Sequence, residues 1–331
     1  MKAISFYGID MGTLMEQLQL PGISIAVSRG GRAETFTCGT GRFGQDYPIT
    51  GDTLFQVASV SKLAFSALVM RLLDEGALTP DADISEYVSD MIDFPITLQA
   101  LLSHTAGFNV HGFSGYPIGG APISLEQVLS GAGNSPKLTR TLPAGEFSYS
   151  GGGYTLAELA LARMMGKPLR ALAQEKVFAP LGMDRSGYFQ PLDDDKVQFA
   201  AFAGPCEDLP AGSDYMYHPE HAAAGLWSTP CDLVKLGLAL GESCRSDGFL
   251  RKKTAQAMTT PVKEDYGLGV IHYPQFGADI YGHSGSNIGY RTLLIFSVTS
   301  PFAAAMCTNA DDCGDCFDRI AMAVLGAEIN R

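Results

Sequence analysis

Residues 55–65 read "FQVASVSKLAF" and contain two serines and one lysine among apolar residues. Lys62 is the only charge in this stretch, and the apolar run continues after it as "SALVMRLLDEG". The pattern predicts a helix whose first turn is buried, ending at Gly76. Burying an ammonium is costly unless it is paired or loses its proton. The lysine therefore requires an explanation.

Ser59 and Lys62 are three positions apart, which places them one turn apart on the same face of a helix. A serine hydroxyl is a weak nucleophile until a base removes its proton, and a buried lysine can be that base. Ser61 points about 100° away from Lys62 and is the weaker candidate. The alternative is that Lys62 extends from a helix end into solvent.

Two further stretches carry polar groups next to glycines. "PAGEFSYSGGGYTL" places Tyr149, Ser150 and Gly151 in a glycine-rich loop just before a helix. "YGHSGSNIGY" places His283, Ser284 and Gly285 at a strand end. Each stretch could serve packing alone, Tyr149 as a loop aromatic and His283 as a strand-end histidine bonded to a backbone group.

Taken together and in this order, the three motifs resemble those of the serine β-lactamase and penicillin-binding protein superfamily. The match is to its class C-like branch, with family VIII carboxylesterases and D-aminopeptidases, which carries S-x-x-K, Y-x-N and K-T-G or H-x-G. The resemblance covers about residues 12 to 327. Supporting stretches are "PGISIAV", "DTLFQVASVSK", "LLSHTAGF", "FSYSGGGY", "AAAGLWSTPCDL" and "GHSGSNIGY".

The resemblance implies a role for each motif residue. Ser59 is the expected nucleophile, Lys62 its base partner, and Tyr149 the proton shuttle to the leaving group, with its phenolate favoured by a nearby ammonium. The backbone amides of Ser59 and Ser286 are expected to form the oxyanion hole. His283 and Gly285 stand in the third motif and Gly151 at the end of the second, as expected substrate-binding positions.

Two positions depart from the family pattern and bear on the substrate. Gly151 stands where asparagine often contacts a substrate amide, and His283 stands where lysine often binds a carboxylate. Both weaken the case for a β-lactamase or D-Ala-D-Ala carboxypeptidase. We expect an acyl-enzyme hydrolase for a small-molecule ester or amide. The alternatives are a D-aminopeptidase, a weak β-lactamase or an acyltransferase, and, in another class, a non-catalytic protein that binds acyl compounds.

The order of expected elements is strands, a long helical block, strands and a final helix. Strands at both chain ends most simply pair in one antiparallel sheet, which predicts an α+β sandwich with a mostly helical insert. We expect the sheet domain to comprise residues 1–60 and 260–331 and the insert residues 61–259. The active site is expected in the cleft between them.

Composition excludes several classes of protein. The 331 residues carry a net charge of −12 and no long basic run, so nucleic-acid binding is not expected. No stretch of about 18 apolar residues predicts a membrane span. The N-terminal stretch reads as a short amphipathic helix without a signal-peptide core, which predicts a cytoplasmic protein. The oligomeric state is not indicated.

No cofactor or metal is expected. The seven cysteines are odd in number and scattered, and Cys313 and Cys316 read as reduced thiols at a helix start. The intervening proline and the loop setting argue against a metal at His218 and His221. His104 reads as a core or loop-anchoring histidine and not as a catalytic one. "GTGRFG" at 39–44 fits a dinucleotide-binding pattern, but no helix follows it.

Overall fold

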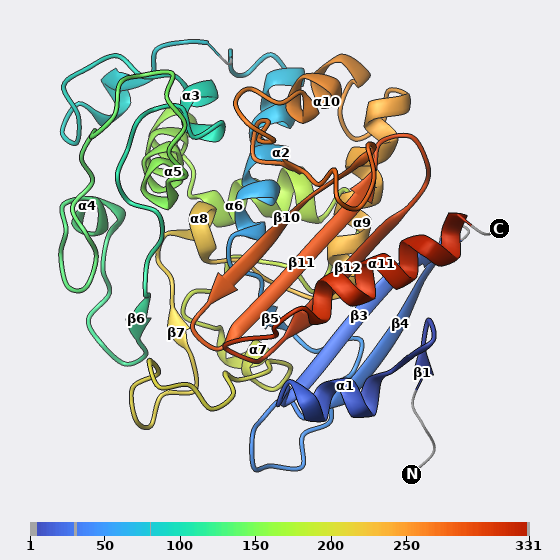
Figure 1. The fold of residues 1–331 in the computed structure, drawn as a ribbon. Helices are drawn as coiled ribbons and strands as arrows, with labels where there is room; N and C mark the ends of the chain where they lie inside the picture. Colours follow the sequence, from blue (N-terminus) through green and yellow to red (C-terminus); the bar gives the residue numbers. More distant parts are fainter. Residues whose placement is uncertain (1–4, 30–31, 80, 330–331) are drawn as a thin grey trace.

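The computed structural model describes residues 5–29, 32–79 and 81–329 and contains a six-stranded antiparallel sheet (Figure 1). The strand order is β4-β3-β12-β11-β10-β9. The strands are β3 (Gly22–Arg29), β4 (Arg32–Gly39), β9 (Ile271–His272), β10 (Ile280–Asn287), β11 (Tyr290–Ser297) and β12 (Ala303–Thr308). β3 pairs with β12, so Ile25 lies opposite Met306. The predicted sheet built from both ends of the chain is confirmed.

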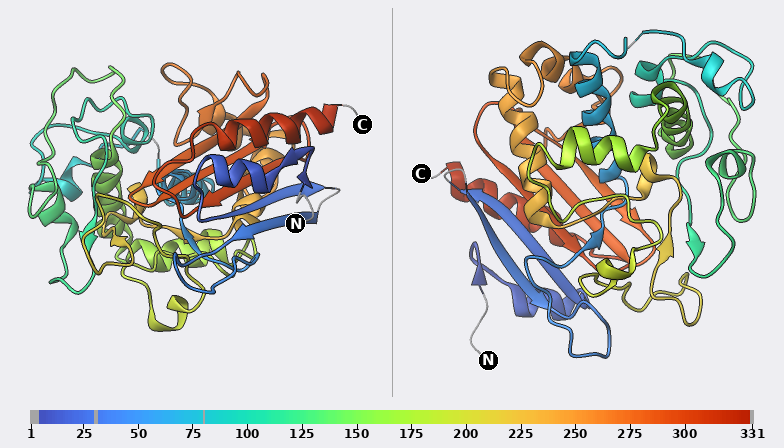
Figure 2. Two further views of the ribbon diagram at one scale, coloured as in Figure 1. Left: turned by 60° about the horizontal axis from the view of Figure 1, so that its bottom comes forward. Right: turned by 180° about the vertical axis from the view of Figure 1, so that it is seen from behind.

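Both faces of the sheet are buried by helices. On one face, alternate residues such as Ile25 and Met306 pack with α1 (Met11–Gln17) and α11 (Cys316–Ile329). On the other face, residues such as Ala305 join the core formed with α2 (Val60–Asp74) and α9 (Pro230–Arg245). Figure 2 shows these layers from two further sides. The period of two along a strand thus supplies two separate cores and gives the predicted α+β sandwich.

The rest of the chain forms helices and loops beside the sheet, many of them at the left and top of Figure 1. The helices are η1 (Ser85–Val88), α3 (Leu98–Leu102), α4 (Leu125–Leu129), α5 (Gly151–Met165), α6 (Leu169–Ala173), η2 (Gln174–Phe178), α7 (Asp194–Val197), α8 (His221–Ala224) and α10 (Lys252–Thr259). Three strand pairs complete the fold: β1 (Ser5–Phe6) with β2 (Ile9–Asp10), β5 (Phe55–Gln56) with β8 (Trp227–Ser228), and β6 (Tyr116–Pro117) with β7 (Met216–Tyr217).

Three elements differ from the expectation. The N-terminal stretch forms a small hairpin, β1–β2, before α1, because Gly8 adopts a left-handed turn (φ 80°). The sequence "YGLGVIHY" at 266–273 predicts a strand, but only Ile271–His272 form one, because Gly269 is also left-handed and turns the chain. α5 begins at Gly151, earlier than expected, because the Ser150 side chain caps the helix through the Gly153 amide.

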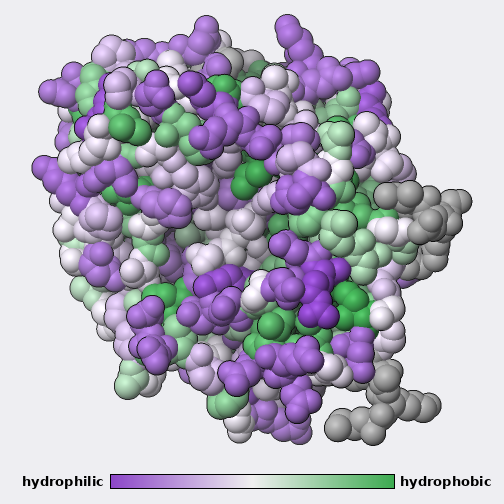
Figure 3. Space-filling model, viewed as in Figure 1, coloured by the Kyte–Doolittle hydropathy of each residue, from purple (hydrophilic) through white to green (hydrophobic). Residues whose placement is uncertain are grey.

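The division at residues 60/61 and 259/260 stays a prediction. α9 lies within the expected insert, yet it packs against β3, β11 and β12 of the sheet. No helix in the described part of the chain is long and apolar enough to cross a membrane. Polar side chains cover most of the face in Figure 3, and hydrophobic ones gather near α1 and α11, where Met322 of α11 is 55% exposed.

Candidate active site

A strained turn presents Ser59 at the start of α2. Ser59 is the N-cap of the helix, and Ala58 before it adopts the left-handed conformation (φ 48°), which is uncommon for a residue with a Cβ. The backbone just before the turn is held by the β5–β8 pair, in which Gln56 lies opposite Trp227. Strain of this kind persists where surrounding structure enforces it, often at functional sites. Ser59 is partly exposed, whereas both its neighbours are buried.

Lys62 lies under this turn and is only 2% exposed. Its Nζ is 2.9 Å from Ser59 Oγ and 2.8 Å from the carbonyl oxygen of Ala223. Burial lowers the pKa of Lys62 to about 7, and the charge of Glu220 partly opposes that effect. Above that pH the neutral amine can donate to the Ala223 carbonyl while its lone pair accepts the Ser59 proton. The geometry of a nucleophile and its base is therefore present.

Ser61 has a structural position. Its Oγ donates to the Ala58 carbonyl oxygen at 2.5 Å and accepts the Leu226 amide at 3.0 Å, and the residue is fully buried. The Ser61 hydroxyl thus links the strained turn to Leu226, the residue directly before β8, and lies in the protein core. The predicted preference for Ser59 over Ser61 agrees with this placement.

Tyr149 lies over Lys62, but not in the expected protonation state. Its ring centroid is 5.0 Å from Lys62 Nζ and 4.2 Å from that of the His104 ring. The expectation that an ammonium would favour a phenolate is wrong. Desolvation by the packed surroundings raises the pKa of Tyr149, and an interaction with Ser59 only partly offsets it. Tyr149 therefore carries a proton that it can give, and Lys62 is the group poised to take one.

His283 is held neutral on β10. It is 1% exposed, its Nδ1 donates to the Ser284 carbonyl at 2.6 Å, and its Nε2 accepts from the Tyr266 hydroxyl at 3.0 Å. A carbonyl can only accept, so the proton of the neutral ring sits on Nδ1. Burial, with a smaller contribution from the charge of Lys62, lowers the pKa of His283 to about 3. The ring thus has no positive charge to offer a substrate carboxylate.

Gly285 allows β10 to approach the nucleophile turn. A Cβ at this position would lie 2.3 Å from the Val57 carbonyl oxygen and 3.1 Å from the Ser59 nitrogen. The next residue, Ser286, is exposed and lines the cleft. The Ser59 amide donates no hydrogen bond to another described residue. The oxyanion hole of the Ser59 and Ser286 amides stays a prediction, and this close approach favours it.

Gly151 lies at the first turn of α5, against the loop that contains His111 and Phe113. Its amide donates to the His111 carbonyl at 2.9 Å, and a Cβ there would meet that oxygen at 3.0 Å and the Phe113 ring at 3.4 Å. The space of the family's asparagine side chain is therefore restricted by residues 111–113. His111 and Phe113 lie in the Gly- and Pro-rich stretch 105–122, and no sequence signal identified them as residues that shape the pocket.

These groups meet in a cleft of about 790 Å³. All seven predicted site residues line it: Ser59, Lys62, Tyr149, Gly151, His283, Gly285 and Ser286. Residues that sequence reasoning missed also line it, among them His111, Phe113, Ala223, Arg291 and Phe317. Cys313 lies at the cleft as well, and all seven cysteines are free thiols.

The residues considered as possible metal ligands have other partners. His218 pairs with Glu220 (Nδ1–Oε1, 2.9 Å) and His221 with Glu158 (Nδ1–Oε1, 3.1 Å). Among the described residues, no group of three histidine, cysteine or acidic side chains could hold a metal ion. His104 accepts the Ser150 amide at 2.9 Å through Nδ1, so it anchors the Tyr149 loop as predicted.

The predicted resemblance is confirmed by comparison with known proteins. The family model described as "Beta-lactamase" matches residues 11–327, nearly the whole chain. The chain therefore belongs to the β-lactamase family, within the superfamily of serine β-lactamases and penicillin-binding proteins. Its relatives in this superfamily are serine hydrolases, in line with the predicted class of enzyme.

Three relatives illustrate the range of the family. The chain is 27% identical over 252 residues to the D-alanyl-D-alanine-carboxypeptidase/endopeptidase AmpH of Escherichia coli K12, covering 72% of this chain and 61% of AmpH. The octameric penicillin-binding protein homologue from Pyrococcus abyssi has a TM-score of 0.78 at 24% identity, covering 98% of this chain and 78% of that one. D-amino acid amidase from Ochrobactrum anthropi SV3 has a TM-score of 0.80 at 21% identity, covering 96% and 97%.

Coverage and sequence identity determine what these similarities show. The chain spans about three fifths of the length of AmpH. The two solved structures are less than 25% identical to it, so they show the fold. The substrate of this chain depends on the residues that line its own cleft.

Proposed function

We propose that the protein is a serine hydrolase that works through an acyl-enzyme. The observation that carries the proposal is the 2.9 Å contact between Ser59 Oγ and Lys62 Nζ, with the pKa of Lys62 lowered to about 7 by burial. A nucleophile, its base and a proton donor, Tyr149, thus line one cleft.

The steps follow from these positions. Lys62 takes the Ser59 proton as Oγ attacks the substrate carbonyl, and the amides of Ser59 and Ser286 stabilise the oxyanion. As the tetrahedral intermediate collapses, Tyr149 gives its proton to the leaving group and recovers one from Lys62. Water, or another acceptor, then attacks the acyl-enzyme by the reverse proton path and releases Ser59.

A short ester or small amide is the substrate that the cleft favours. His283 is neutral with both ring nitrogens engaged, and Gly151 has no side chain and little room for one. The cleft therefore has neither the lysine nor the asparagine that the family pattern often places at these two positions. The D-amino acid amidase and AmpH similarities make a D-amide or D-peptide the leading alternative.

Two other kinds of function are alternatives to the esterase proposal. A weak β-lactamase or an acyltransferase would use the same acyl-enzyme and differ in the acyl donor or acceptor. A non-catalytic protein that binds acyl compounds would leave the Ser59–Lys62 contact unused. Intact-mass analysis after exposure to a serine-reactive phosphonate separates the last case, since an idle site takes up no label.

A substrate panel tests the esterase proposal. We expect kcat/KM for a short p-nitrophenyl ester to exceed that for a chromogenic cephalosporin. The loss of a charge-assisted contact at His283 alone disfavours the cephalosporin by about ten- to a hundredfold. A D-amino-acid anilide completes the panel. A preferred cephalosporin would contradict the esterase proposal, and a preferred anilide would establish the aminopeptidase alternative.

Replacing Tyr149 by phenylalanine tests the proton donor. We expect kcat to fall about a hundredfold for a poor leaving group, because the phenol proton is lost while the ring still packs on His104. For a p-nitrophenyl ester, whose leaving group departs without a proton, the loss should be smaller. Equal losses of kcat for both leaving groups would show that Tyr149 serves packing alone.

The proposal also extends to the location, cofactors and partners of the protein. A cytoplasmic location is proposed, and the seven unpaired thiols support it. The proposed reaction uses protein groups alone and calls for no cofactor. The partner is the small-molecule substrate, and the octameric assembly is a property of the Pyrococcus abyssi homologue.

A further inference from the structure

The proposed reaction creates a buried charge at Lys62. When Nζ accepts the Ser59 proton it becomes an ammonium at a residue only 2% exposed. An unpaired charge in such a place is unstable, so the surroundings determine how readily the proton moves. The titratable groups around it come from several elements: Tyr149 and Tyr154 by their rings, His104, His111 and His283 as imidazoles, and Glu220 as a carboxylate.

The three histidines and two tyrosines offer no negative charge. Burial and the charge of Lys62 keep the pKa values of His104, His111 and His283 below their ordinary value, so these rings are neutral. Desolvation raises the pKa of both tyrosines, so they stay protonated. Glu220 alone among these groups can bear a negative charge opposite the ammonium.

Glu220 is also connected to Lys62 through the backbone. It is the N-cap of α8, the four-residue helix His221–Ala224, and the Ala223 and Ala224 amides donate to its carbonyl oxygen at 3.2 and 3.0 Å. Ala223 in turn supplies the carbonyl that accepts Lys62 Nζ at 2.8 Å. Glu220 thus helps to fix the position of the carbonyl that orients the amine.

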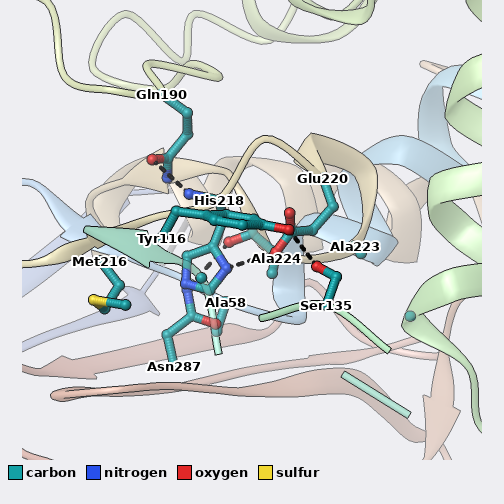
Figure 4. Close-up of polar contacts among 12 residues, drawn as sticks. Ala58, Tyr116, Ser135, Gln190, Met216, His218, Glu220, Ala223, Ala224 and Asn287 are labelled. Carbon is teal, nitrogen blue, oxygen red and sulfur yellow. Dashed lines mark hydrogen bonds and ion pairs between the residues drawn. The ribbon is translucent and has the colours of Figure 1, made fainter. Parts of the chain in front are cut away.

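His218 holds Glu220 in place. Both side chains are 0% exposed, and His218 Nδ1 lies 2.9 Å from Glu220 Oε1 (Figure 4). The backbone of His218 is itself fixed, because its amide donates to Gln190 Oε1 at 3.1 Å. Tyr116, whose hydroxyl contacts Ser135, also faces this pair, and the charge of Glu220 contributes to raising its pKa.

We propose that Glu220, held by His218, is a positioning residue for Lys62: its carboxylate stabilises the ammonium formed when Ser59 attacks, and its helix aims the Ala223 carbonyl at Nζ. The inference deepens the proposed serine-hydrolase function and rests on it. Neither residue touches the substrate. In low-dielectric surroundings a carboxylate acts over longer distances than in water, so direct contact with Lys62 is unnecessary.

The chain offers a matched control in Glu158 of α5. Glu158 is buried and braces the same short helix from another side, since its Oε2 accepts the Ala222 amide at 2.7 Å and its Oε1 meets His221 Nδ1 at 3.1 Å. Its carboxylate is already engaged by the Ala222 amide and His221, and the charge named as acting on Lys62 is that of Glu220. Glu158→Gln therefore weakens the support of α8 while leaving the Glu220 charge in place.

The test measures the rate of Ser59 labelling by a fluorophosphonate between pH 5 and 10, by intact mass, in the native protein and both variants. In the native protein the rate should rise through about pH 7 as Lys62 becomes neutral. In Glu220→Gln the midpoint should move down by about one pH unit and the plateau rate should fall, because the amine is a weaker base. In Glu158→Gln the midpoint should stay at the native value, whatever the plateau.

The outcomes separate the two proposals. A native protein that is never labelled overturns the serine-hydrolase function and this inference with it. A labelled native protein with an unmoved midpoint in Glu220→Gln overturns the inference alone, as does an equal shift in Glu158→Gln. If Glu220→Gln does not fold, Glu220→Asp decides. It keeps the charge, so we expect a native midpoint with a lower plateau, and a midpoint lowered by a full unit would overturn the inference.

Discussion

Ser59→Ala removes hydrolysis, with an expected loss in kcat of about five orders of magnitude or more. The alanine takes away the oxygen proposed to form the acyl-enzyme, and the neighbouring Ser61 cannot replace it, since its Oγ is engaged with Ala58 and Leu226. The measurement is ester turnover together with intact mass after phosphonate treatment, in which the variant should stay unlabelled.

Ser61→Ala is the matched control for Ser59→Ala. It should still be labelled and turn over ester, but unfold at lower denaturant concentration, because the buried Leu226 amide loses its acceptor at a cost of about 1–3 kcal/mol. Labelling of Ser59→Ala at the native rate would show that the nucleophile is assigned wrongly. Loss of labelling in a folded Ser61→Ala protein would point to the same error.

Lys62→Met should lower kcat/KM about ten-thousandfold while making the protein more stable at neutral pH. The loss of activity follows from removal of the base. The gain in stability follows from linkage. The folded state binds the Lys62 proton only below about pH 7, whereas the unfolded chain binds it up to about pH 10.5, so burial of Lys62 costs several kcal/mol at pH 7 and the cost shrinks as pH rises.

Methionine has similar length and no charge, so it removes that cost. It also leaves the Ala223 carbonyl without its donor, at about 1–3 kcal/mol, which offsets part of the gain. Urea unfolding of both proteins at pH 7 and pH 10 is the measurement. At pH 7 the Lys62→Met variant should have the larger free energy of unfolding, and its advantage over the native protein should narrow toward pH 10. A difference that does not change with pH would mean that Lys62 keeps an ordinary pKa in the folded protein.

The parts of this protein that could be predicted from sequence are those written in local patterns. The three-residue spacing of Ser59 and Lys62 depends only on helix geometry, and the alternation of Ile23, Ile25 and Val27 with small residues in "GISIAVS" depends only on the period of a strand. The order of the motifs along the chain was enough to identify the superfamily. None of these inferences required knowledge of how distant segments meet.

The parts that could not be predicted depend on long-range packing. Gly151 was identified, but not the His111–Phe113 backbone and ring that restrict its surroundings. Glu220 was passed over beside two histidines considered as metal ligands, because nothing local in the sequence shows that its charge acts on Lys62. The protonation of Tyr149 was predicted wrongly since desolvation, unlike proximity to a charge, is a property of the whole packed site.

The pairing of β3 with β12 has a consequence for how the protein is made. Ser59 and its helix leave the ribosome early, but β10, with Gly285 and Ser286, follows only after about 230 further residues, which takes roughly 10–45 s at the usual pace of translation. Until then β3 has only β4 as a partner, and the close fit of Gly285 under Val57 cannot form. A nascent chain therefore carries Ser59 before Gly285 and Ser286 can join it, and the cleft is complete only when the last strands have paired with the first.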